Sequence, residues 1–150
     1  MPLSTTFRAR RPYDPSHPDA MAIYCSDGRF TDAVEELLHG LGHPRLDTMT
    51  LPGGPALFNA WLAGMSESMT VSASARFLIE AHSIRRVILI AHEGCGFYKK
   101  HFPHAKAADI RKHQEDDLHR AAEAVKSMPV DVLLYVALVD EGHVTFEKIA

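Results

Sequence analysis

The two cysteines of this 150-residue chain both stand where an apolar run gives way to small and charged residues. Cys25 closes the run "AMAIYC", and Cys95 comes three residues after His92, the first polar residue beyond "VILIA". Thiolates and imidazoles are the ligands that Zn²⁺ prefers, so Cys25, His92 and Cys95 form a candidate zinc set. Three protein ligands leave one tetrahedral position open, which is typical of catalytic rather than structural zinc sites.

Asp27 and Arg29 follow Cys25 at intervals of two residues. If the backbone stays extended there, all three side chains fall on one face of the chain. An arginine beside a carboxylate keeps it ionised and fixes its direction. Asp27 could then orient a water at the open metal position, or swing in and take that position itself. The segment therefore carries a candidate catalytic pair.

The elements that must position these residues alternate between strands and helices. A parallel sheet collects ligands at the carboxyl ends of its strands, where Cys25 and His92 stand. The pattern predicts an α/β fold with a mainly parallel sheet of about five strands. The last two runs are separated by a short turn, so the final strand is expected to be antiparallel. Apolar runs predict strands at 20–25, 46–51, 85–91, 130–140 and 143–149, and helical spacing predicts helices at 31–42, 72–83 and about 106–127.

The segments "CSDGR" (25–29) and "HEGCG" (92–96) resemble the zinc-binding segments of the β-class carbonic anhydrases. The resemblance extends patchily over about residues 20–149, through "SASARFLIEAHSIRRVILIAHEGCG" and "LLYVALVDEGHVTFEKI". It implies a sheet order of 2-1-3-4 with a fifth, antiparallel strand. It also implies that Cys25, His92 and Cys95 bind zinc, and that Asp27 and Arg29 act in the reversible hydration of carbon dioxide to bicarbonate.

Carbon dioxide is small and apolar, so its pocket should be lined by apolar side chains. Phe97 lies beside the second motif, and Gly96 could offer a backbone N–H near the metal. Export of the released proton needs a group that titrates near neutrality, for which His101 and His104 are candidates. Phe30, Leu51 and Tyr98 could line the pocket or belong to the core.

The sequence departs from the family between its two motifs. The stretch "TLPGGPALFN" (50–59) stands where the family carries an arginine- and asparagine-containing segment, and the N-terminal helices of the family look reduced or absent. Other activities therefore stay open. The site could hydrolyse carbonyl sulfide or carbon disulfide, it could hold zinc without catalysis, or Cys25 and Cys95 could form a reversible disulfide.

Composition narrows the classes of partner. Lys and Arg number 16 against 19 Asp and Glu, and a net charge of −3 argues against nucleic acid. The longest apolar run, 132–139, is far below the ~20 residues that span a membrane. Two cysteines without a signal peptide suggest the cytoplasm. Residues 1–19 read as an irregular arm and 20–150 as one domain. A small-molecule substrate and a homodimer are expected, with "WLAGM" (61–65) in the interface or the core.

Overall fold

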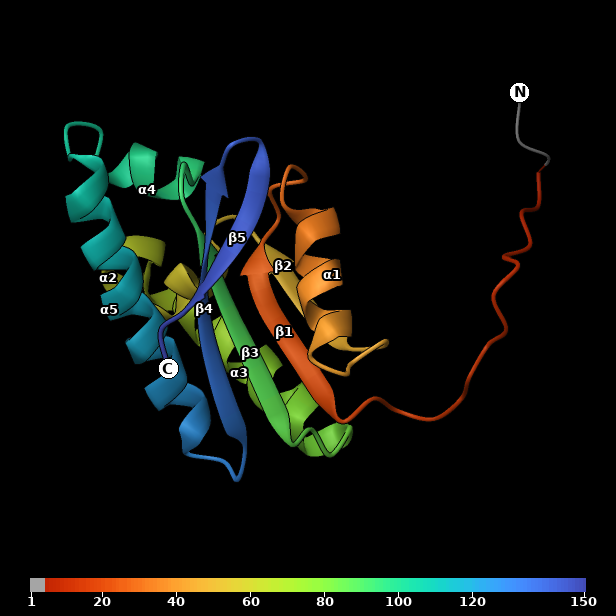
Figure 1. Ribbon diagram of the computed structural model, residues 1–150. Coiled ribbons are helices and arrows are strands. Elements are labelled where there is room, and N and C mark those ends of the chain that lie inside the picture. Colours follow the sequence, from red (N-terminus) through yellow and green to blue (C-terminus); the bar gives the residue numbers. More distant parts are fainter. Residues whose placement is uncertain (1–4) are drawn as a thin grey trace.

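The computed structural model describes residues 5–150, and residues 5–19 contain no helix or strand. Its centre is a five-stranded sheet in the order β2-β1-β3-β4-β5 (Figure 1). All neighbouring pairs are parallel except β4 and β5, which form a hairpin. The expected α/β fold, sheet order and final antiparallel strand are thus confirmed. The strands are β1 (Ala20–Cys25), β2 (Asp47–Leu51), β3 (Arg86–His92), β4 (Asp131–Asp140) and β5 (His143–Lys148).

Helices cover both faces of the sheet, which explains why the central strands are almost continuously apolar. One face packs against α1, and the other packs against η1, α3 and α5. β3 lies in the middle, and its residues Val87, Ile88 and Leu89 are fully buried. The helices are α1 (Thr31–Gly40), α2 (Ala60–Ala63), α3 (Met65–Ala81), α4 (Gly96–His101) and α5 (Ala107–Lys126), with a 3₁₀ helix, η1 (Gly54–Phe58).

The expected start of the second helix at residue 72 is wrong, because α3 begins at Met65. Its first two turns place Met65 and Met69 in solvent, so their spacing does not mark a buried face. Gly64 separates α2 from α3 with a φ of 96°, a backbone conformation that favours glycine. Three short helical segments, η1, α2 and α4, were not expected from the sequence because they are too short to show a period.

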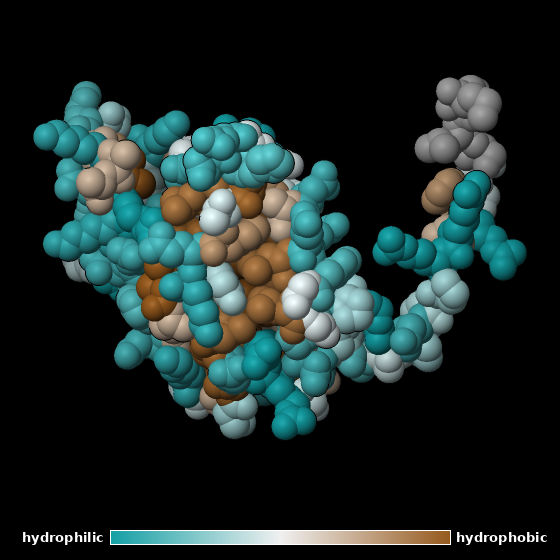
Figure 2. Space-filling model, in the orientation of Figure 1, coloured by the Kyte–Doolittle hydropathy of each residue, from teal (hydrophilic) through white to brown (hydrophobic). Residues whose placement is uncertain are grey.

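Two apolar surfaces remain uncovered. Within residues 5–150, α1 is the only helix on its face of the sheet, and Figure 2 shows a broad apolar area between α1 and β5. The other surface lies on α2 and α3, where Trp61 is 95% exposed. In the stretch 61–65, Trp61 and Met65 are therefore exposed, whereas Leu62 packs against the buried cluster of Ala56, Cys95 and Tyr98. No helix in the described part of the chain is long and apolar enough to cross a membrane. The apolar area between α1 and β5 contains the half-buried side chains Leu37, Leu133, Val144 and Phe146.

Candidate metal centre

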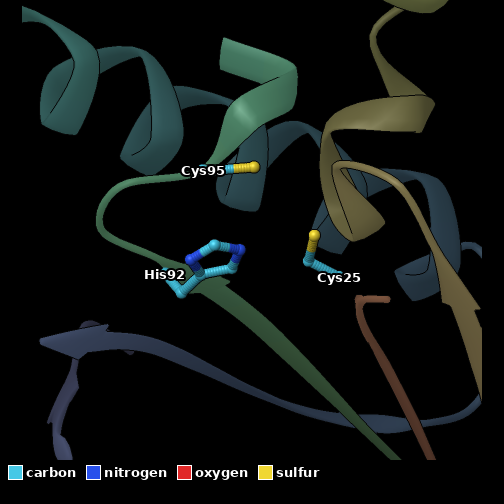
Figure 3. A group of neighbouring side chains, drawn as sticks. All are labelled: Cys25, His92 and Cys95. Atoms are coloured by element: carbon cyan, nitrogen blue, oxygen red, sulfur yellow. The ribbon is translucent and has the colours of Figure 1, made fainter. Parts of the chain in front are cut away.

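The three candidate ligands meet at the carboxyl ends of β1 and β3. These strands are parallel neighbours, with Tyr24 opposite Ile90, so Cys25 and His92 end side by side. Cys95 follows three residues beyond β3. The ligand atoms of Cys25, His92 and Cys95 all lie within 4.8 Å of one another. Figure 3 shows the three side chains directed into one common space.

A tight turn returns Cys95 to His92. Gly94 adopts a φ of 69°, which a residue with a Cβ rarely takes. Glu93 anchors the turn to β4: its N–H donates to the Ala137 carbonyl at 2.9 Å, and its carboxylate accepts from the N–H of Val139. Glu93 thus holds the turn that carries Cys95 through both its own backbone and its own side chain.

The His92 imidazole is oriented so that its Nε2 could bind a metal. Its Nδ1 lies 2.7 Å from the Glu93 carbonyl, to which a protonated Nδ1 donates. Its Nε2 is buried and has no hydrogen-bond partner within residues 5–150. The Phe30 ring packs on the imidazole, with centroids 4.3 Å apart. Burial lowers the pKa of His92, but the neighbouring Cys25 and the Glu93 carbonyl outweigh it and raise the pKa.

The two thiols shift each other's pKa in opposite directions. The Cys95 thiol donates to Cys25, which lowers the pKa of Cys25 against the opposing effect of burial. Backbone N–H groups of Gly53 and Asp27 also favour the Cys25 thiolate. The same hydrogen bond, together with burial, raises the pKa of Cys95. Two sulfurs and an unpaired imidazole nitrogen in this arrangement fit Zn²⁺, which binds thiolate and neutral imidazole.

Asp27 and Arg29 are in contact beside these donors. Arg29 Nη2 donates to Asp27 Oδ2 at 2.6 Å, and Arg29 Nε lies 3.0 Å from Oδ1. These hydrogen bonds lower the pKa of Asp27 to about 2. The expected extended backbone is wrong. The chain turns after Cys25, because Asp27 Oδ1 also accepts from the N–H of Arg29 and the Asp27 carbonyl accepts from the N–H of Phe30.

The loop between the two motifs approaches the site through its backbone. A Cβ on Gly53 would lie 2.7 Å from the Phe97 ring, and one on Gly54 would lie 2.6 Å from the Tyr24 backbone. Both glycines have positive φ, 83° and 50°. Gly54 therefore lets the loop pack directly on the backbone of Tyr24 and Cys25, and Gly53 lets it pack on the ring of Phe97.

The other residues that the sequence suggested for the site differ in whether they lie near the three candidate ligands. Gly96 begins α4 with open space at its missing Cβ, and Phe97 packs between Gly53 and His101. Tyr98 is fully buried, and its hydroxyl is bonded inside the protein rather than directed at a pocket. Phe30 contacts His92. Leu51 is partly exposed, His101 and His104 are exposed, and none of the three lies among the contacts of the ligand atoms described above.

Sequence reasoning missed three polar residues behind the site. Gln114 and Asp117 lie on the buried face of α5, and Asn59 lies at the end of η1. Gln114 donates to the His92 carbonyl at 2.7 Å, and Asn59 donates to Asp117 at 2.8 Å. A signal for the burial of two of them was present in the sequence, since Gln114 and Asp117 share the helical spacing of the apolar residues Leu118 and Ala121.

This fold is that of the β-carbonic anhydrases. A β-carbonic anhydrase of the fungus Sordaria macrospora, described as tetrameric, is 11% identical with a TM-score of 0.53, covering 90% of this chain and 82% of its own. One from Trichomonas vaginalis is 16% identical with a TM-score of 0.52, covering 93% and 87%. The Coccomyxa enzyme in complex with acetazolamide is 15% identical with a TM-score of 0.52, covering 87% and 72%.

Similarity in sequence is weaker. No family model matches the chain. An uncharacterised protein of Rickettsia bellii is 27% identical over an alignment of 123 residues, and the alignment covers 79% of this chain and 74% of the relative. The comparisons thus show the fold and leave the activity to be argued from the site.

Proposed function

We propose that this protein is a zinc-dependent enzyme of the β-carbonic anhydrase type, which converts carbon dioxide to bicarbonate reversibly. One observation carries the proposal: the donor atoms of Cys25, His92 and Cys95 converge, and the Asp27–Arg29 pair lies beside them. A metal-binding group alone would not need that pair. Zinc held by these ligands would supply the Lewis acidity that makes a water nucleophilic.

The residues of the chain would divide the remaining work. Asp27 Oδ2 lies 3.9 Å from His92 Nε2, so its carboxylate borders the space of the metal. With a pKa of about 2 it stays ionised and is a weak base. Its role is therefore to accept a hydrogen bond and orient the attacking water, while Arg29 holds it in place.

The substrate would lie on the side of the site formed by the start of α4. Phe97 offers an apolar ring packed on Gly53, and Gly96 leaves open space beside Cys95. Both features suit a small apolar molecule. Carbonyl sulfide and carbon disulfide have the same linear shape, so the experiment includes them as alternative substrates.

The test is stopped-flow hydration of carbon dioxide by protein of measured zinc content. We expect activity with about one zinc per chain, and loss of activity in Asp27→Asn with zinc retained. Asp32→Asn, an aspartate in the first turn of α1, is the matched control and should keep activity. Turnover of carbonyl sulfide or carbon disulfide without hydration would replace the substrate. Full zinc without any turnover would identify a zinc protein that lacks catalysis.

We also propose that the protein acts as a homodimer. Met65, Met69 and Phe77 are exposed on α3 at multiples of four residues, and Trp61 precedes them on α2. Spacing by four residues places side chains on one face of a helix. Such an exposed apolar stripe is typical of an interface between chains, and one fungal neighbour of the same fold is described as tetrameric.

A further inference from the structure

A buried carboxylate lies behind the metal centre and receives hydrogen bonds from three segments. Asp117, on α5, is 3% exposed. Its Oδ2 accepts from the Tyr98 hydroxyl at 2.6 Å. Its Oδ1 accepts from Asn59 Nδ2 at 2.8 Å and from Arg120 Nη1 at 3.0 Å. A buried carboxylate is costly unless it is bonded in this way, so the site is built around it.

The first of these hydrogen bonds reaches the segment of Cys95. Tyr98 lies one helical turn after Cys95, and the Cys95 carbonyl accepts from the N–H of Lys99 in the first turn of α4. Cys95 and Tyr98 belong to one small buried cluster with Ala56 of η1. The Tyr98 hydroxyl on Asp117 therefore fixes the turn of helix from which the Cys95 sulfur projects.

The second hydrogen bond reaches the segment of Cys25. Asn59 ends η1, whose first residue, Gly54, packs against the backbone of Tyr24 and Cys25. Holding Asn59 in place therefore holds the loop that presses on Cys25.

A neighbouring residue on α5 reaches the third ligand. Gln114 lies three residues before Asp117, is 2% exposed, and donates to the His92 carbonyl at 2.7 Å. One buried face of α5 thus contacts the segments of all three candidate ligands. Apolar side chains, such as those of Leu118 and Ala121 further along α5, could be buried on this face at a lower cost in free energy. The polar residues instead impose defined directions on what they touch.

We propose that Asp117 is a positioning residue for the metal centre, which ties the Cys25 loop through Asn59 and the Cys95 helix through Tyr98 at the spacing that binds zinc. The inference rests on the proposed zinc site. It assigns no contact between Asp117 and metal or substrate. Its consequence is a slower loss of zinc than the three ligands alone would give, because outer-shell partners of a metal site affect its affinity by about 10–100-fold.

The test compares two tyrosine-to-phenylalanine variants of the zinc-loaded protein. Tyr98→Phe removes only the hydroxyl on Asp117, and we expect zinc transfer to a chromophoric chelator to become about tenfold faster or more. Tyr135→Phe makes the same change in β4, in the buried cluster on the α1 side, and should stay within about twofold of the parent. In the Co²⁺-substituted protein, the absorption bands of the metal should shift in Tyr98→Phe alone.

Asp117→Asn provides a second, independent variant. If Tyr98 acts through Asp117, the double variant should lose zinc little faster than the worse single variant. Unchanged zinc transfer and unchanged Co²⁺ bands in both single variants, with only a lower melting temperature, would overturn the inference. That result would leave the proposed enzyme intact, since these measurements involve no carbon dioxide. A parent protein that binds neither Zn²⁺ nor Co²⁺ would overturn both.

Discussion

The Nε2 atom of His92 lies 3.9 Å from the Oδ2 atom of Asp27, at the edge of the space into which both cysteine sulfurs also point. A carboxylate so placed could itself become a fourth ligand. It is held back by Arg29, which binds both of its oxygens. Arg29 is largely exposed and Asp27 is not, so the arginine holds the carboxylate from the solvent side. In the proposed zinc enzyme, retaining Asp27 in this position would keep a place open beside the three donors.

Replacing Arg29 should therefore reduce activity without removing the metal. In Arg29→Lys the charge remains, but an ammonium group cannot bind both oxygens of Asp27 in the fixed geometry of a guanidinium. We expect carbon dioxide hydration to fall by about tenfold or more, as for other groups that orient a metal site. Stopped-flow rates and metal analysis of the same samples provide the measurement.

Arg45→Lys is the matched control for this variant. Arg45 also pairs with an aspartate, Asp14, but it ties the N-terminal arm to the end of the α1–β2 loop. Its rate should equal that of the parent. Equal rates in all three proteins would show that the geometry of the Arg29–Asp27 pair does not affect catalysis.

Removal of the metal should expose two thiols of unequal reactivity. Cys25 is half-buried and its pKa is lowered by the hydrogen bond from Cys95, whereas Cys95 is buried and its pKa is raised. Since the thiolate is the reactive form, a disulfide reagent should react with Cys25 first and with Cys95 in a slower phase. With zinc bound, both should be protected.

The measurement is a thiol titration followed in time, with and without a chelator. Cys25→Ser should remove the fast phase, because only Cys95 then remains to react. Two thiols that react at the same rate whether or not chelator is present would contradict the metal site. Thiols that appear only after treatment with a reductant would instead support the reversible disulfide.

The fold could be predicted from the sequence because its strands are nearly continuous apolar runs and its motifs stand at their ends. β3 shows this best, since Val87 to Ile90 are all buried and no polar residue interrupts them. The ligand set followed from the same feature. Both cysteines lie at strand ends, and parallel strands bring such ends together.

What surrounds the ligands could not be predicted, because it depends on contacts between distant segments. A hydrogen bond from the N–H of Arg29 to the Asp27 side chain helps to form the turn between these residues. The sequence pattern alone predicted an extended backbone there. Asn59, Tyr98 and Asp117 are far apart in the chain, and no local period marks them as partners. The start of α3 could not be predicted either. Its first two turns carry exposed methionines, so the apolar residues there do not follow the spacing of a buried helix face.

The glycine at position 54 should be required for both stability and metal binding. In Gly54→Ala the new methyl group would meet the β1 backbone at 2.6 Å, and the residue would keep a φ of 50°. Backbone cannot move aside as a side chain can, so we expect a loss of about 2 kcal/mol or more in the free energy of unfolding. Zinc content should fall as well, since the displaced backbone is that of Cys25.

Gly42→Ala separates strain from collision. Gly42 has a φ of 90°, but nothing lies within 4 Å of its missing Cβ. It should cost only the conformational part, about 1 kcal/mol, and should keep its zinc. Thermal unfolding and metal analysis of both variants check the prediction. Equal losses in the two would mean that the loop yields to the methyl group at position 54.

The exposed stripe on α3 should determine the state of association. Charges introduced at Met69 and Phe77 would have to be buried in any interface formed there. We expect sedimentation to show two chains per particle for the parent protein and one for the double variant Met69→Glu, Phe77→Glu. Val139→Glu places a charge at another exposed apolar residue, in β4, and should leave the dimer intact. Dissociation by Val139→Glu alone would locate the interface on the sheet side.

Tyr98 should make the protein sensitive to alkaline pH. Burial, followed by the neighbouring charge of Asp117, raises the pKa of Tyr98 above its ordinary value of 10.0. Above pH 10 the unfolded chain therefore releases this proton while the folded protein retains it, so stability falls as the pH rises. Phenylalanine at this position has no proton to release. The free energy of unfolding of the parent, minus that of Tyr98→Phe, should thus decrease by about 1.4 kcal/mol per pH unit once the pH exceeds 10. Urea unfolding of the two metal-free proteins at several pH values measures this difference, in which the contributions of the other ionising groups cancel. A difference that stays constant from pH 8 to pH 11 would mean that Tyr98 ionises as readily in the folded protein as in the unfolded chain, and that its bond to Asp117 is not maintained in solution.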